Sequence, residues 1–252
     1  MTPSADFTIL IPTRLESSRL PNKALADILG IPMIIRVANQ AKKSHAKQVV
    51  IATDSDKIAE VCQKFNFSFI KTSSSHQSGT DRLAEAVQKL NIPDDEIILN
   101  IQGDEPLINP QLINQLAAKL AGCSTPIATL AHPIYSEEEY KNPNIVKVVL
   151  NKNQEAMYFS RSLIPFLRNK NPELSILRHI GLYAYRAQFL KTYYKLGTSS
   201  LEHVESLEQL RILWHGYAIS VLVTEEKTSI GVDTPEDLNK VIELIKKNKE
   251  LL

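Results

Sequence analysis

The first half of the chain alternates short apolar runs with amphipathic stretches. The apolar runs have the length of strands, whereas the stretches between them carry apolar residues at intervals of three and four, as one face of a helix does. This alternation is typical of a parallel sheet with helices on both faces. The predicted strands are residues 7–12, 48–53, 67–70 and 96–101, and the predicted helices are residues 33–43, 56–65, 80–90 and 110–121.

The second half loses this rhythm, because its β-branched and aromatic runs are separated by loops. We therefore expect a mixed extension of the sheet there. Thr234 as N-cap, Pro235 at the first helical position and acids in the first turn predict a final helix. The other predicted elements are strands at 126–134, 144–151, 179–186 and 218–224 and one amphipathic helix over 200–216.

These elements predict an α/β fold of the Rossmann-like, doubly wound type, with a mainly parallel (mixed) sheet and a smaller lobe. A chain of 252 residues is near the upper limit for one hydrophobic core. Because no repeat and no linker rich in Gly, Pro or Ser divides it, we expect a single domain over residues 1–252. Its core would comprise approximately residues 1–125 and 215–252, and its lobe residues 126–214.

Composition narrows the class of protein. The 29 Lys and Arg residues nearly balance the 28 Asp and Glu residues, so the net charge of +1 provides no general attraction for nucleic acid or an anionic membrane. The two cysteines suit neither a disulfide framework nor a metal site, and Cys62 occupies an apolar helical position that predicts a buried thiol. The N-terminus lacks the pattern of a signal peptide, and no apolar run reaches the ~20 residues of a membrane span, so we expect a cytoplasmic protein.

A basic loop follows the first predicted strand and contains Arg14, Arg19 and Lys23. Charge alone fits a solvated surface as well as a phosphate site. Its position favours the phosphate site, because open parallel sheets bind ligands beyond the carboxyl ends of their strands. The loop is not a Walker A motif, since the chain has no Gly-Lys-Ser/Thr triplet.

Two acids far apart in the sequence are candidates for a magnesium site. Asp104 and Glu105 follow directly after a predicted strand, and Asp233 precedes the N-cap of the last helix. Magnesium typically takes one or two protein carboxylates together with phosphate oxygens and water. The alternative is that these acids only form turns, in which Asp is common.

The segment SSSHQSGTDRL, residues 73–83, is rich in hydrogen-bond donors and leads into a predicted helix. It would suit a base or a ribose, but it also fits an ordinary loop that ends in an N-cap. Taken singly, His179, Tyr183, Glu208 and Arg211 have no distinguishing pattern.

Nine motifs, which together span nearly the whole chain, occur in the same order as in a known family. The chain resembles the CMP-KDO synthetases, a family of the sugar-nucleotide cytidylyltransferases, which also include the CMP-sialic acid synthetases; KDO is 3-deoxy-D-manno-octulosonate. The motifs are IPTRLESSRLPNK (11–23), VVIATDSD (49–56), HQSGTDRLAE (76–85), NIQGDEPLI (100–108), NPNIVKVVL (142–150), YFSRSLIP (158–165), RHIGLYAYR (178–186), LEHVESLEQLRILWHG (201–216) and GVDTPEDL (231–238).

The resemblance implies a role for each matching residue. Catalysis would use Lys23, Arg14, Asp104 and Asp233, of which the two acids would ligate Mg²⁺. CTP would contact Ile11, Pro12, Arg14, Arg19, Lys23, His76, Ser78, Gly79 and Gln102. The sugar acid would contact Gln102, Arg161, His179, Tyr183, Glu208 and Arg211, with Arg161 pairing with its carboxylate.

The implied reaction joins CMP from CTP to KDO, releases pyrophosphate and serves lipopolysaccharide biosynthesis. The resemblance further implies a homodimer, with residues 126–214 as the sugar-binding and dimerisation lobe. Alternatives are the same chemistry on 8-amino-KDO or sialic acid, or a non-catalytic relative that binds CTP or a CMP-sugar. The chain departs from the family pattern at Thr13, where Ala is usual, and at Asn22, where Gly is usual. Asn tolerates a left-handed backbone, so we expect the loop to keep its shape.

Overall fold

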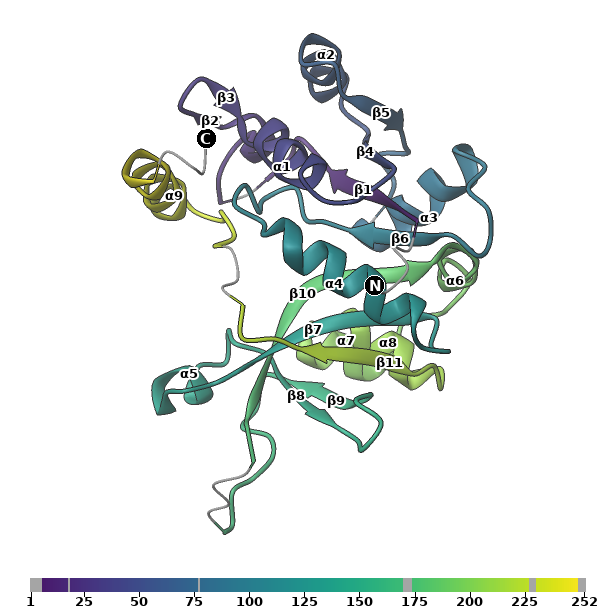
Figure 1. Ribbon diagram of the computed structural model, residues 1–252, viewed down its shortest axis with the longest axis vertical. Helices are drawn as coiled ribbons and strands as arrows, with labels where there is room; N and C mark the ends of the chain where they lie inside the picture. Colours follow the sequence, from purple (N-terminus) through teal and green to yellow (C-terminus); the bar gives the residue numbers. More distant parts are fainter. Residues whose placement is uncertain (1–5, 18, 77, 170–173, 227–229, 249–252) are drawn as a thin grey trace.

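A mixed sheet forms the centre of the molecule in the computed structural model, which describes residues 6–17, 19–76, 78–169, 174–226 and 230–248 (Figure 1). Its main strands follow the order β11-β7-β10-β6-β1-β4-β5. Only β10 runs antiparallel to its neighbours among these seven. The predicted mainly parallel, mixed sheet is therefore confirmed. The strands are β1 (Phe7–Thr13), β4 (Gln48–Thr53), β5 (Ser68–Lys71), β6 (Ile97–Asn100), β7 (Ile127–Pro133), β10 (Leu177–Arg186) and β11 (Ile219–Val223).

Helices cover both faces of this sheet. Every residue of the inner strand β1 is buried, with Ile9 and Ile11 in one core cluster and Leu10 in the other. Alternate side chains of a strand point to opposite faces, so one strand contributes to both clusters. Cys62 is buried as predicted, and burial raises the pKa of its thiol to about 11. The first face carries α1 (Met33–Lys42), α2 (Asp56–Lys64) and α4 (Pro110–Ala121), and the second carries α3 (Gly79–Lys89), α6 (Ala187–Tyr193) and α8 (Gln209–Trp214).

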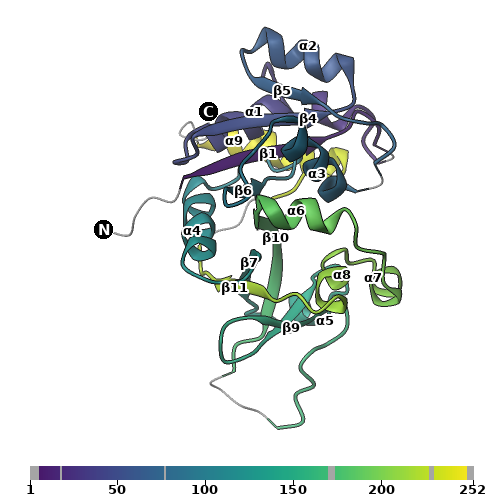
Figure 2. The ribbon, with the colours of Figure 1, turned by 90° about the vertical axis from the view of Figure 1, so that its right-hand side faces the viewer.

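A small lobe extends below the sheet in Figures 1 and 2. It contains the antiparallel pair β8 (Lys147–Leu150) and β9 (Ala156–Ser160), which joins the sheet through β10. The short helices α5 (Glu137–Lys141) and α7 (Ser200–Glu205) lie beside it. Strands β7 and β10 pair within the main sheet, so the segment 126–214 contributes to both parts. No helix among the described residues is long and apolar enough to cross a membrane.

The last helix, α9 (Pro235–Lys247), returns to the N-terminal part of the molecule. Its buried Val241 and Ile245 share a small core with Ile28 and Met33. Thr234 caps the helix by accepting a hydrogen bond from the Asp237 N–H, which confirms the predicted start. This packing holds the residue before the cap beside the loop that follows β1. Three short elements complete that loop region: η1 (Lys23–Leu25), β2 (Asp27–Ile28) and β3 (Ile31–Pro32).

The prediction of one helix over residues 200–216 is wrong. The chain forms α7 and α8 instead, and Ser206 between them has a left-handed backbone, with φ of 52°. The amphipathic pattern continues across the break, so periodicity alone does not reveal it. Arg161 stabilises the end of α7, because its Nε donates to the Glu205 carbonyl over 2.7 Å and its guanidinium also reaches the Ser206 carbonyl. A distant side chain thus satisfies carbonyls that the break leaves without helical partners.

The break predicts an unusual order of stability among variants of Ser206. Glycine adopts a left-handed backbone without steric cost, so Ser206→Gly should raise the free energy of unfolding by about 0.5–1 kcal/mol, and Ser206→Ala should lower it by about 1 kcal/mol. A continuous helix would give the reverse order, since alanine is the best helix former and glycine a poor one. Urea unfolding of the three proteins distinguishes the two orders.

Candidate active site

The carboxyl ends of β1 and β6 open onto a cavity of about 340 Å³. The loop after β1, the start of α3, the loop after β6 and Asp233, which precedes the N-cap of α9, all contribute to its lining. The end of β1 and the loop after β6 lie close together. At Gly103 there is little room for a side chain, since a Cβ there would lie only 3.2 Å from Thr13 Oγ1. The predicted residues that line this cavity are Pro12, Arg14, Arg19, Lys23, His76, Ser78, Gly79, Gln102, Asp104, Glu208 and Asp233.

Lys23 joins the two predicted metal ligands. Its Nζ lies 2.5 Å from Asp104 Oδ2 and 3.0 Å from Asp233 Oδ1, and Arg19 lies 3.1 Å from the same Asp233 oxygen. Burial alone would lower the pKa of Lys23, but the two carboxylates outweigh burial and raise that pKa. Two acids that are far apart in sequence therefore face one cationic group.

The backbone at Asn22 explains how Lys23 reaches this position. Asn22 has φ of 55° and ψ of 34°, and its left-handed conformation starts the short helix η1 at Lys23. Asn is among the residues that adopt this conformation most readily after Gly. Asn22 thus adopts the left-handed backbone that Asn was expected to tolerate.

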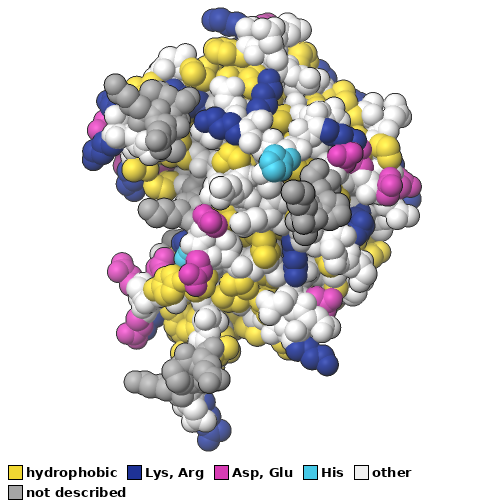
Figure 3. Space-filling view, viewed as in Figure 1, with side chains coloured by type: hydrophobic (Ala, Val, Ile, Leu, Met, Phe, Trp, Pro, Cys, Tyr) yellow, Lys and Arg dark blue, Asp and Glu magenta, His cyan; other side chains and the backbone are white. Residues whose placement is uncertain are grey.

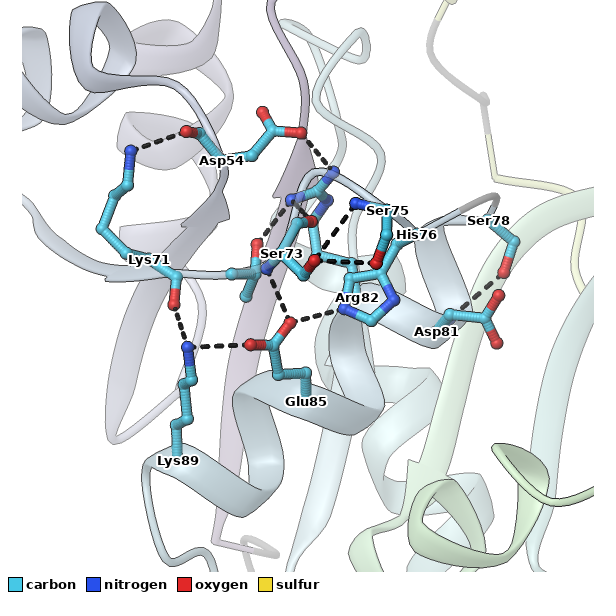
Figure 4. Close-up of polar contacts among 11 residues, drawn as sticks. Asp54, Lys71, Ser73, Ser75, His76, Ser78, Asp81, Arg82, Glu85 and Lys89 are labelled. Atoms are coloured by element: carbon cyan, nitrogen blue, oxygen red, sulfur yellow. Dashed lines mark hydrogen bonds and ion pairs between the residues drawn. The ribbon is translucent and has the colours of Figure 1, made fainter.

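The loop before α3 forms another part of the lining and is shown in Figure 4. Ser78 is the N-cap of α3 and accepts a hydrogen bond from the Asp81 N–H. One turn further along the helix, the buried Arg82 also lines the cavity. Its guanidinium donates to Thr72 Oγ1 over 2.5 Å and to Asp54 Oδ2 over 2.8 Å. Arg82 thereby connects α3 to the ends of β4 and β5.

Glu85 fixes the orientation of His76. Its Oε2 accepts the Ser73 N–H over 2.8 Å and lies 2.5 Å from His76 Nε2 (Figure 4). Burial alone would raise the pKa of Glu85, but the donors on Lys89, Ser73 and His76 lower it to about 2. A carboxylate only accepts hydrogen bonds, so Nε2 carries the proton. The second ring nitrogen of His76 faces away from Glu85 in Figure 4.

A second cavity, of about 310 Å³, adjoins the first. Gly79, Gln102 and Glu208 line both, so the two cavities meet at these residues. His179 and Tyr183, both predicted to contact the sugar acid, lie in the wall of the second cavity. The arrangement offers room for two molecules that touch at the junction.

Burial determines the charge states of two residues that line the second cavity, His179 and Glu208. Burial lowers the pKa of His179 to about 3, so its imidazole is neutral at pH 7. Its Nε2 lies 3.1 Å from Thr129 Oγ1. The Glu208 side chain is accessible from the two cavities, but protein surrounds it on the other sides. This partial burial disfavours the charged carboxylate and raises the pKa of Glu208.

Three predicted site residues do not line either cavity. Ile11 is fully buried in the first core cluster. The Arg161 guanidinium donates to backbone carbonyls at the end of α7 and at Pro143. Arg211 forms a buried pair with Glu202, donating from Nε over 2.8 Å and from a terminal nitrogen over 2.5 Å. In this conformation both arginines hold the α7–α8 region together.

Several lining residues were not among the predicted ones. Arg82 lies within the motif HQSGTDRLAE, four residues after the helix N-cap, where a side chain returns to the helix start. Asn100 is a polar residue within an apolar strand, which is a signal that the sequence does provide. Tyr193 gives no such signal, because it resembles any aromatic residue at the end of an amphipathic helix.

The carboxylates of Asp104 and Asp233 fit a magnesium ion. Both offer oxygen ligands at the edge of a cavity that is also lined by basic residues, and a single ammonium nitrogen already contacts both. Magnesium usually needs no more than two protein carboxylates when phosphate and water complete its shell. Within the described residues, no group of three or more His, Cys, Asp or Glu side chains gathers to form an all-protein metal site.

The fold and the two cavities are those of a nucleotidyltransferase, and the comparison with known proteins makes this assignment specific. The sequence profile of the cytidylyltransferase family, described as "Cytidylyltransferase", matches residues 8–228. The chain belongs to the cytidylyltransferase family, and it is similar to proteins named 3-deoxy-manno-octulosonate cytidylyltransferase.

Relatives match the chain over nearly its whole length. The 3-deoxy-manno-octulosonate cytidylyltransferase of Neisseria meningitidis serogroup C (strain 053442) is 52% identical over 244 residues, which cover 94% of this chain and 96% of that protein. The enzyme of the same name from Vibrio campbellii (strain ATCC BAA-1116) is 50% identical over 250 residues, covering 97% and 99%. A solved CMP:2-keto-3-deoxy-manno-octonic acid synthetase in complex with CTP superimposes with a TM-score of 0.90 at 42% identity, covering 96% and 99%.

The contacts of Glu85 predict its effect on nucleotide binding. Glu85→Ala frees His76 and the Ser73 N–H, so the loop should lose its fixed place in the cavity wall. We expect the KM for CTP to rise about tenfold, as loss of ~1–2 kcal/mol implies, with little change in the KM for the sugar. Steady-state kinetics with each substrate varied in turn measures both constants.

Lys89→Met is the matched control, because it removes the 2.8 Å pair with Glu85 Oε1 and a 2.9 Å hydrogen bond to the Lys71 carbonyl but keeps the contacts of Glu85 with His76 and the Ser73 N–H. Such helical pairs contribute about 0.3–0.5 kcal/mol, so its KM for CTP should stay within about twofold of the parent. A Glu85→Ala enzyme with an unchanged KM for CTP would contradict the assigned role of Glu85.

Proposed function

We propose that this chain transfers the cytidylyl group of CTP to KDO with the help of Mg²⁺, giving CMP-KDO and pyrophosphate. The observation that carries the proposal is the convergence of Lys23, Asp104 and Asp233 at the carboxyl edge of the sheet, in the wall of the first cavity, which adjoins the second. The similarity to 3-deoxy-manno-octulosonate cytidylyltransferases supports KDO as the sugar, and the CTP complex of the similar structure supports CTP as the nucleotide.

The first cavity is the proposed nucleotide site. Arg14, Arg19 and Lys23 form its basic side and would bind the triphosphate. His76 and Ser78 also line it and would hold the cytidine. The near-zero net charge of the chain means that this local group, rather than a general field, attracts the anion.

The second cavity is the proposed sugar site, with Gln102, His179, Tyr183 and Glu208 in its wall. A hydroxyl of the sugar acid would reach the junction at Gln102 and attack the α-phosphorus of CTP. A new oxygen–phosphorus bond then forms as the bond to the pyrophosphate oxygen breaks. The chain needs no covalent nucleophile, since its residues position two anions and offset their charge.

Asp104 and Asp233 would hold Mg²⁺. When bound, the ion neutralises phosphate charge and lowers the pKa of a coordinated hydroxyl. Lys23 would then turn from the two acids to the phosphates, where its charge offsets the negative charge on the leaving pyrophosphate. We also propose that the product, CMP-KDO, is used in lipopolysaccharide assembly and that the protein is cytoplasmic.

Incubation of the protein with CTP, Mg²⁺ and KDO tests the activity directly, with pyrophosphate release as the readout. Parallel reactions with 8-amino-KDO and sialic acid test the sugar. A protein that binds CTP but releases no pyrophosphate with any of the three sugars would contradict the proposal and would favour a non-catalytic nucleotide-binding relative.

Removal of either proposed metal ligand should abolish most activity. We expect Asp104→Asn and Asp233→Asn each to lower kcat by about a hundredfold or more, the cost of losing one electrostatic stabiliser. Each should also weaken the binding of Mn²⁺ in the presence of CTP, measured by electron paramagnetic resonance. Glu105→Gln is the control, because Glu105 adjoins Asp104 in sequence but does not line the cavity. Near-normal turnover of either Asn variant at saturating Mg²⁺ would reject the assignment.

The lobe is the proposed surface for a homodimer. Exposed apolar side chains gather there, including Phe166, which is 84% exposed, and Val204, which is also 84% exposed. Figure 3 shows hydrophobic side chains over the lower half of the molecule, where the lobe lies. A patch of this kind typically marks an interface in a stable protein.

Charge placed in this patch should dissociate the dimer. We expect the parent protein to have a dimeric mass at micromolar concentration in light scattering, and Phe166→Glu to have a monomeric mass. Leu244→Glu is the matched control, because Leu244 is exposed on α9, away from the lobe, and its variant should stay dimeric (Figure 1). A monomeric mass for the parent protein would rule out this proposal.

A further inference from the structure

Three buried polar groups in the wall of the second cavity lack hydrogen-bond partners among the described residues. One is the hydroxyl of Tyr183 on β10, which the sequence already predicts to contact the sugar acid. The other two are the Tyr193 hydroxyl, at the end of α6, and Asn100 Oδ1, at the end of β6. Tyr193 is 1% exposed and Asn100 is 3% exposed. A buried group without a hydrogen bond is destabilising, so proteins retain such groups mainly where a ligand or water pairs with them.

Packing holds Tyr193 and Asn100 firmly in the cavity wall. The Tyr193 ring lies beside Phe189, with a centroid distance of 6.3 Å, and the Arg211 guanidinium carbon lies over the Tyr193 ring, 5.0 Å from its centroid. Asn100 pairs with Tyr183 across β6 and β10. Both residues therefore belong to the rigid part of the fold, where a polar group can be placed accurately against a ligand.

We infer that Tyr193 and Asn100 bind hydroxyl groups of the sugar acid and determine which sugars the enzyme accepts. The inference rests on the proposed assignment of the second cavity to the sugar. Burial raises the pKa of Tyr193, so its hydroxyl stays protonated and can donate, while Asn100 Oδ1 can only accept. One donor and one acceptor in fixed positions match hydroxyl groups, each of which can accept and donate.

This pairing gives selectivity that an apolar wall cannot. A sugar that lacks the matching hydroxyl would leave Tyr193 or Asn100 buried without a partner even when the site is filled. Sites built to hydrogen-bond a substrate hydroxyl reject analogues that lack it far more strongly than apolar pockets reject an extra methylene. Tyr193 and Asn100 are thus specificity-determining residues for the sugar rather than for CTP.

Tyr193→Phe tests the inference, because it removes one oxygen and keeps the ring. We expect kcat/KM for KDO to fall ten- to hundredfold, while the KM for CTP stays within about twofold. The thermal midpoint should be unchanged or higher, because the variant loses an unpaired buried hydroxyl. A purely structural role would lower the midpoint and disturb both substrates, and that result would overturn the inference.

Deoxy analogues of KDO identify the contact. For the analogue that lacks the hydroxyl bound by Tyr193, the parent enzyme and Tyr193→Phe should react at similar rates, since each lacks one side of the same interaction. Tyr217→Phe is the matched control: Tyr217 packs on Phe189 with a centroid distance of 4.9 Å and does not line the second cavity. Its kinetics with KDO should equal those of the parent enzyme. If Tyr193→Phe reacts more slowly than the parent enzyme with every deoxy analogue, by the same factor as with KDO, then Tyr193 does not bind a hydroxyl of the sugar.

Gly181→Val separates this inference from the assignment on which it rests. Gly181 lines the second cavity, and a Cβ there would meet no atom within 4 Å. The valine side chain should therefore fit the protein and obstruct the sugar, raising the KM for KDO alone. If Gly181→Val impairs KDO and Tyr193→Phe does not, the sugar site stands and our inference fails. If neither variant alters the kinetics with KDO, the assignment of the cavity fails as well.

Discussion

The contact of one ammonium group with two carboxylates organises the active site. Lys23 comes from the loop after the first strand, Asp104 from the loop after β6 and Asp233 from the chain that enters the last helix. Two negative charges placed this close together repel each other unless a cation lies between them. Each of the three segments therefore depends on the other two for its position, and the cation site exists only in the folded chain.

The rest of the fold can be understood as support for this contact. The left-handed backbone at Asn22 directs Lys23 inward, and the capping of α9 at Thr234 leaves the preceding Asp233 free to face the cavity. The packing of Val241 and Ile245 against Ile28 and Met33 fixes α9 beside the loop. These contacts are local or apolar, so they add no net charge to the site, and its electrostatics are determined by the few ionic groups that face it.

Sequence predicts those parts of the molecule that depend on local pattern. The strands, the cap at Thr234 and the positions of Asp104 and Asp233 after or before regular elements follow from periodicity and from the geometry of parallel sheets. The break at Ser206 does not follow, because it depends on Arg161, which lies far away in the chain and satisfies the freed carbonyls. The position of Tyr193 is equally hidden, since only tertiary packing reveals that its hydroxyl faces a cavity.

The same break explains why the two cavities share a wall. The left-handed backbone of Ser206 ends α7 before α8 begins, and Glu208 follows two residues later at the junction of both cavities. The buried pair of Arg211 and Glu202 ties the two helices together across the turn, so Glu208 cannot move far from Gln102 and Gly79. If residues 200–216 formed one continuous helix, Glu208 would not lie at the junction of the two cavities. The strained backbone of one serine thus helps to decide where the two substrates can meet.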